Sequence, residues 1–137
     1  LFSLVCLLHA TPSQAATRTW VNTAGGFWNN GANWSGGVVP VAGDTVLINA
    51  NGTYTVTLVS EAEFASLTLG GGTGTQTLQW ATGSMSGNLT VAANGVLNFG
   101  GNSSKTFIGG SLTAANAVGN ACASKRIASQ FESRQLN

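Results

Sequence analysis

The chain has 137 residues, enough for one domain with a modest core. Charged residues make up 7% of it and its net charge is +1, so it lacks the basic patch that nucleic-acid binding needs. The 43% of hydrophobic residues argue against disorder, and the 19 glycines argue against a helical protein. Runs of Thr, Val and Leu interrupted by Gly and Asn are typical of short strands with tight turns. We therefore expect an all-β protein.

Residues 1–15 are expected to form a secretory signal peptide with a truncated start. Leu1–Leu8 is apolar and uncharged, and Ser13-Gln14-Ala15 places small residues at the two positions that signal peptidase reads. The apolar run is shorter than the about 20 residues that a bilayer-spanning helix needs. We therefore expect an exported protein, at the cell surface or outside the cell, with no membrane span in the mature chain.

Cleavage after Ala15 removes Cys6 and the only histidine, His9. The mature chain then keeps one cysteine, Cys122, and forms no internal disulfide. An exported chain of this kind must be held together by backbone pairing and packing.

Residues 16–40 are rich in aromatic residues, Gly and Asn. Trp20, Phe27, Trp28 and Trp34 precede the first repeat described below. A stack of β-coils leaves its end strands unpaired, and large apolar side chains can cover that end. We expect this segment to be an aromatic N-terminal cap.

Residues 41–115 contain a short strand-like repeat. Its copies are Val46-Leu47-Ile48, Leu67-Thr68-Leu69, Leu89-Thr90-Val91 and Leu112-Thr113-Ala114, with first residues 21, 22 and 23 positions apart. A second strand follows the first three copies: Tyr54-Thr55-Val56-Thr57-Leu58, Thr77-Leu78-Gln79-Trp80 and Val96-Leu97-Asn98-Phe99. A period of 20 to 25 residues with two or three strands in each is typical of a solenoid. The alternative is an antiparallel β-sandwich. The small residue that precedes each Leu-Thr strand favours the solenoid over the sandwich.

Two segments resemble a known family. The segment from Trp28 to Gly37, with Val39 to Val46 after it, is similar to the opening of bacterial exported β-helix proteins that carry autotransporter-associated β-strand repeats. The segment from Gly87 to Gly101 is similar to one of their coils. The resemblance implies a right-handed parallel β-solenoid from the N-terminal part of a filamentous, adhesin-like surface protein. The four copies of the repeat predict about four coils. It carries over no catalytic residues.

Catalytic and metal-binding patterns are missing from the mature sequence. Without histidine, a Ser-His-Asp arrangement is impossible. Asp44, Glu61 and Glu63 are the only acidic residues of the body, too few for calcium, and we interpret Asp44 as the polar residue of a turn and the glutamates as a solvated turn. No Cys/His spacing suits zinc. We expect no enzyme activity, no cofactor and no metal.

Glycans are the most specific partner that the residues suggest, with a host or neighbouring cell surface as the broader possibility. Trp28, Trp34 and Trp80 are candidate rings for stacking on sugars. Three hypotheses follow: a structural or adhesive solenoid segment, a carbohydrate-binding module, and the N-terminal fragment of a β-helix polysaccharide-degrading enzyme. Residues 116–137 lose the β pattern, and we interpret them as an atypical tail that is disordered or weakly helical.

Overall fold

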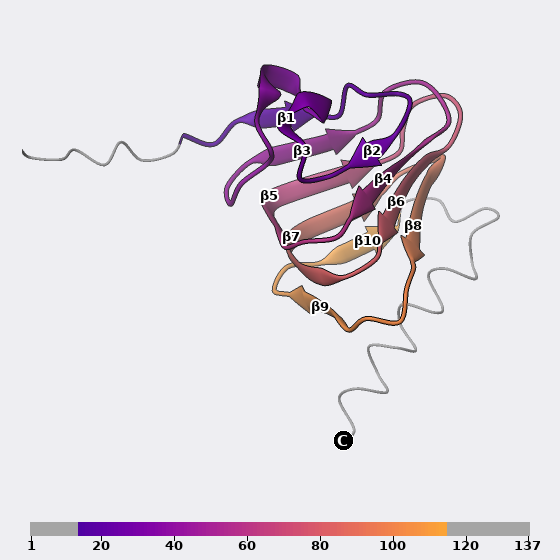
Figure 1. Ribbon diagram of the computed structural model, residues 1–137. Helices are drawn as coiled ribbons and strands as arrows, with labels where there is room; N and C mark the ends of the chain where they lie inside the picture. Colours follow the sequence, from indigo (N-terminus) through magenta and orange to yellow (C-terminus); the bar gives the residue numbers. More distant parts are fainter. Residues whose placement is uncertain (1–13, 115–137) are drawn as a thin grey trace, which may run out of the picture.

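The computed structural model describes residues 14–114, which form ten strands and two 3-10 helices (Figure 1). In chain order they are β1 (Thr17–Thr19), β2 (Gly26–Phe27), η1 (Gly31–Asn33), η2 (Ser35–Gly37), β3 (Thr45–Ile48), β4 (Tyr54–Leu58), β5 (Ala62–Leu69), β6 (Gln76–Trp80), β7 (Gly83–Val91), β8 (Gly95–Phe99), β9 (Lys105–Ile108) and β10 (Leu112–Ala114). The expected signal peptide up to residue 13, Cys122 and the tail at 116–137 lie outside the described residues.

The strands form a parallel β-solenoid. One sheet has the order β1-β3-β5-β7-β10, with β9 also on β7, and the other has the order β2-β4-β6-β8. All strand pairs among the described residues are parallel, which excludes the antiparallel sandwich. The stack makes about three turns, fewer than the four coils expected.

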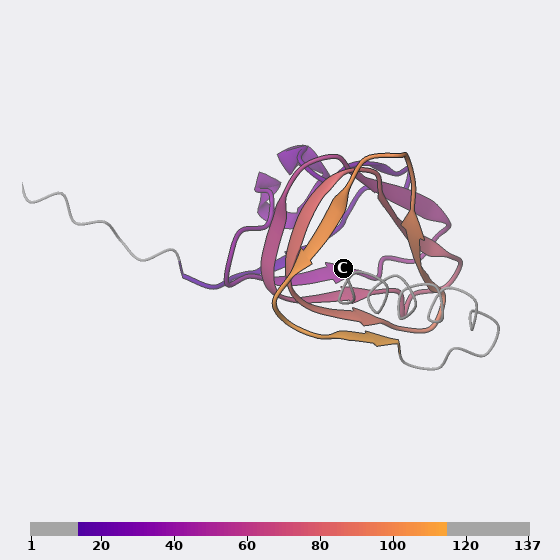
Figure 2. The same ribbon diagram turned by 90° about the horizontal axis from the view of Figure 1, so that it is seen from below.

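Each turn of the solenoid has three sides, and Figure 2 shows the resulting triangular outline along the stack. β5 and β7 are long because each runs along two sides. The register between them shifts between Glu63 and Ser66, where β5 passes from one side to the next. The first part of β7 pairs with β9 and its last part pairs with β10.

The register confirms the repeat read from the sequence. Val46 pairs with Leu67, Leu67 with Leu89, and Leu89 with Leu112. Side chains at equal places in successive coils therefore stack into columns, and the inward columns make the core. Val46, Leu67 and Leu89 are each at most 1% exposed. Burying a side chain of this size contributes about 1.5–3 kcal/mol.

Side-chain amides join successive coils at one corner of the solenoid, where the chain passes from β3 to β4, from β5 to β6 and from β7 to β8. Asn51 Oδ1 accepts the N–H of Thr73 at 3.0 Å, and Asn94 Nδ2 donates to the carbonyl O of Gly72 at 2.9 Å. The buried Gln76 amide donates to the carbonyl oxygens of Gly52 and Thr73, both at 2.8 Å. These bonds span 22 to 24 residues when they run between coils, so they hold the coils in register.

Candidate functional site

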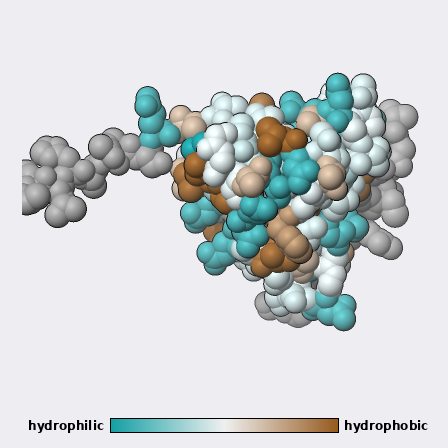
Figure 3. Space-filling model, turned by 45° about the horizontal axis from the view of Figure 1, so that its top comes forward, coloured by the Kyte–Doolittle hydropathy of each residue, from teal (hydrophilic) through white to brown (hydrophobic). Residues whose placement is uncertain are grey.

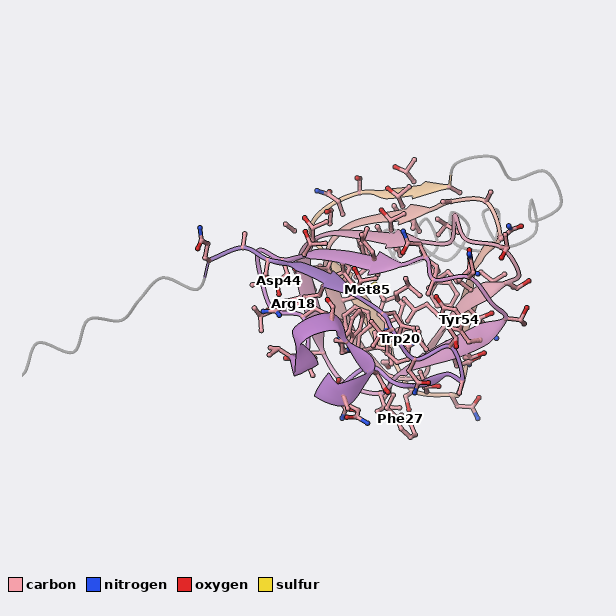
Figure 4. All side chains as sticks on the ribbon, turned by 90° about the horizontal axis from the view of Figure 1, so that it is seen from above. Arg18, Trp20, Phe27, Asp44, Tyr54 and Met85 are labelled. Carbon is pink, nitrogen blue, oxygen red and sulfur yellow. The ribbon has the colours of Figure 1, made fainter. Side chains whose placement is uncertain are left out.

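The tryptophans that precede the first repeat form one buried cluster at the end of the stack. The ring centroids of Trp28 and Trp34 are 4.8 Å apart and those of Trp20 and Trp34 are 5.1 Å apart, both with edge-on geometry. Phe64 lies 6.3 Å from Trp28, which joins the cluster to the first full coil. Figure 4 shows Trp20 well inside the molecule and Phe27 at its outer edge. Each edge-to-face pair stabilises the fold by about 0.5–1.5 kcal/mol beyond the contribution from burying the rings.

The rings predicted to stack on glycans are not accessible to a ligand. Trp28, Trp34 and Trp80 are 1%, 2% and 3% exposed. Trp80 packs against Phe99 at a centroid distance of 5.6 Å, and its Nε1 donates to the carbonyl O of Gly83 at 3.3 Å. Stacking on a sugar requires a ring face in solvent. The burial of these side chains therefore contradicts the proposed stacking role, and Trp80 does not lie on an exposed strand face.

Two asparagines fix the loop that carries the tryptophans, and sequence reasoning missed their role. Asn22 Nδ2 donates to Asn33 Oδ1 at 2.9 Å and to the carbonyl O of Gly25 at 2.8 Å. Asn33 is 5% exposed, and its Nδ2 donates to the carbonyl O of Phe27 at 3.0 Å. Most buried side-chain amides in proteins are hydrogen-bonded, and these contacts pair the amides of both asparagines. The available signal was the placement of Asn33 directly beside Trp34 in an otherwise apolar cluster.

Asp44 ties the first strand to the first full coil. Its carboxylate accepts the N–H of Ala16 at 2.8 Å, the N–H of Val41 at 3.1 Å and the Nε–H of Arg18 at 3.3 Å. Burial alone raises the pKa of Asp44, but these donors and the Arg18 charge outweigh it and hold the pKa below its ordinary value of 3.8. Figure 4 shows Arg18 and Asp44 side by side. The carboxylate is fully used in structure, as expected for a turn residue.

The remaining acidic residues do not come together in a site. Glu61 lies just before β5 and Glu63 lies on it, and both are exposed. Within residues 14–114, no three His, Cys, Asp or Glu side chains lie close enough to hold a metal ion. The described part of the chain also contains no helix long and apolar enough to cross a membrane.

Three apolar side chains near the end of the stack that the tryptophan cluster covers are exposed. Phe27, Val21 and Val38 are 55%, 53% and 45% exposed. Figure 3 shows the apolar areas on the upper part of the molecule as small patches between polar ones. Scattered exposed apolar residues of this kind are normal on a protein surface and do not mark a docking site.

The most regular surface lies on the side built by β1, β3, the last part of β5, the last part of β7, and β10 (Figure 1). Inward and outward side chains alternate along each strand, so two outward ladders run along the stack. One ladder is Thr17, Thr45, Ser66, Asn88 and Ser111, and the other is Thr19, Leu47, Thr68, Thr90 and Thr113. We call these ten side chains the threonine face. It contains eight hydroxyls and no charged side chain.

Comparison with known proteins finds no match: no protein-family model, no curated protein and no solved structure is significantly similar to this chain. The resemblance to autotransporter-associated repeats therefore stays a prediction from the residues that carry it.

Proposed function

We propose that this chain is a non-catalytic architectural segment of an exported surface protein. In this proposal the rigid solenoid projects from the cell and exposes its outer sides to solvent. The carrying observation is the unbroken parallel register of the coils, from Val46 through Leu67 and Leu89 to Leu112. Such a stack is stabilised by each coil's contacts with its neighbours, needs no disulfide, and presents long regular sides to solvent.

The closed end supports the same proposal. The tryptophan cluster covers the end of the core next to β1 and β2 with rings that are at most 2% exposed. Terminal coils of solenoids need such covering to stay soluble. The apolar run Leu1–Leu8 and the small residues up to Ala15 support export.

Export is tested by placing the chain, with an initiating Met, ahead of a phosphatase reporter that is active only outside the bacterial cytosol. We expect reporter activity and a mature N-terminus at Ala16. The matched control carries Leu4→Arg and Leu7→Arg, which interrupt the apolar run and should abolish activity. An inactive wild-type fusion, or equal activity in the control, would contradict export.

The non-catalytic part of the proposal has its own test. The purified chain is incubated with a panel of soluble polysaccharides, and new reducing ends and unsaturated products are measured. We expect neither above the protein-free blank. Turnover of any polysaccharide would show that the chain is an enzyme.

A further inference from the structure

The threonine face is a two-dimensional lattice of hydroxyl groups. Its five strands are in continuous parallel register, so equivalent side chains repeat about every 4.7–4.9 Å along the stack. From the first strand to the fifth, the face is about 19 Å long. Within a strand, residues two apart lie about 6.6 Å from each other. Stacked coils keep a sheet flat where an isolated sheet would twist. The face is therefore flat, regular and free of charge.

The hydroxyls of the second ladder are rigid and available. Threonine is β-branched, which restricts its χ1 rotation. Among the described residues, the side-chain hydroxyls of Thr68, Thr90 and Thr113 have no protein hydrogen-bond partner. In the first ladder, Asn88 is occupied, because its Oδ1 accepts from the N–H of Ser111 and its Nδ2 donates to the carbonyl O of Ala65. The second ladder is thus the pre-ordered part of the face.

We propose that the threonine face binds the surface of ice. Ice is an uncharged lattice of hydrogen-bond donors and acceptors, with a repeat close to the spacing between β-strands. Hydroxyls fixed in a matching lattice lose little rotational freedom on contact, which favours adsorption. A protein partner would be expected to meet aromatic or Arg anchors, and a polysaccharide to meet aromatic rings. The ten side chains of the face include neither.

The other two sides of the solenoid lack this pattern. On the β2-β4-β6-β8 sheet, the outward ladders place Thr55 beside Thr77 and Val96, and Thr57 beside Gln79 and Asn98. On the third side, Glu63 is in register with Ser86 and Ile108. Charge and uneven side-chain length interrupt a match to a regular lattice, so ice binding is assigned to the threonine face alone.

The test measures incorporation of the fluorescently labelled full chain into slowly growing ice, together with thermal hysteresis. We expect the wild type to enter the ice and to depress the growth temperature. Thr68→Tyr with Thr90→Tyr puts bulk on the flat face and should abolish both effects. The matched control, Thr55→Tyr with Thr77→Tyr, puts the same bulk on another side and should keep both.

Three outcomes would overturn the proposal. They are wild-type protein that stays in the liquid, equal loss in the control variant, and retained incorporation after Thr68→Tyr with Thr90→Tyr. Wild-type adsorption to crystalline cellulose or chitin without adsorption to ice would assign the face to polysaccharide instead. Far-UV circular dichroism reports whether the variants fold.

A second variant decides the question if the tyrosine variants do not fold. Leu47 interrupts the second ladder between Thr19 and Thr68. Leu47→Thr completes that ladder with a smaller side chain that is well suited to a strand. It should increase thermal hysteresis at equal protein concentration. Unchanged or reduced hysteresis in the folded variant would contradict the proposal.

Discussion

At the residue scale, Asp44 shows how one charged group is accommodated in a core that is otherwise neutral. It is 1% exposed, and the Arg18 side chain that faces it is 21% exposed. An ion pair of this kind contributes little by itself, because removing charges from water offsets the attraction. The two backbone N–H groups that also donate to the carboxylate make the arrangement favourable.

Asp44→Asn should destabilise the protein by about 1.5–3 kcal/mol at neutral pH, the range for hydrogen bonds to charged groups. The amide keeps the size of the side chain but removes the charge and weakens the acceptor. Urea unfolding followed by circular dichroism measures the change. The control Glu63→Gln alters an exposed carboxylate and should stay within about 0.5 kcal/mol of the wild type. Equal stability of both variants would contradict this account.

The pH dependence follows from the lowered pKa of Asp44. Because the native pKa lies below the unfolded value of 3.8, the unfolded state binds more protons near that pH. The stabilisation is complete above 3.8 and is lost as the pH falls through the native pKa. Unfolding free energies measured at stepwise lower pH should therefore decline in that range, and Asp44→Asn should reduce the decline. An identical decline in the variant would exclude Asp44 as its source.

The sequence predicted part of this site. The position of Asp44 after Pro40 identified it as a turn residue, and the hydrogen bonds between Val41 and Asp44 confirm that role. Its partner Arg18 is 26 residues away, and no local pattern connects the two. The sugar-stacking role of Trp28, Trp34 and Trp80 was predicted wrongly, because these rings are buried. The local sequence does not show whether a tryptophan ring faces the core or the solvent.

At the element scale, the corners decide how closely the coils stack. Gly87 lies within β7, where the strand turns from one side to the next, and has a φ of 126°. A Cβ at this position would overlap the carbonyl oxygen of Phe64 in the preceding coil. Glycine is therefore required twice at Gly87, by the backbone conformation and by the neighbouring coil.

Gly87→Ala should destabilise the protein by more than the about 1–2 kcal/mol that positive φ alone costs. The matched control is Gly43→Ala, since Gly43 has a φ of 92° but open space around its Cβ position. The difference in unfolding free energy between the two variants measures the close approach of the coils. Equal losses would mean that β7 moves away from Phe64 without cost.

The first two strands of each coil were predictable, and the third was not. Leu67-Thr68-Leu69 and Tyr54-Thr55-Val56-Thr57-Leu58 show the alternation or apolar character that strands require. The first part of β7 reads Gly-Ser-Met-Ser, which has little strand propensity, although Met85 is fully buried. It is a strand because β5 and β9 pair with it on both edges. Tertiary pairing overrides the local preference here.

At the scale of the whole molecule, stability is expected to vary along the stack. A coil with neighbours on both faces gains two sets of contacts, whereas a terminal coil gains one. Native-state hydrogen exchange should therefore protect the amides of β4 and β6 most and those of β9 and β10 least. Uniform protection along the chain would show that the described coils unfold as one cooperative unit instead.

The position of the tryptophan cluster predicts that folding starts at the N-terminal end of the solenoid. Its three tryptophans lie within residues 20–34, and Phe64 completes it from the first full coil. Proteins are synthesised from the N-terminus, and N-terminal units generally fold first. We therefore expect the end covered by the tryptophan cluster to fold while later coils are still being made, so that each new coil pairs with strand edges that are already in place. A chain built this way can fold vectorially as it emerges, with pairing always between coils that are neighbours in time as well as in space.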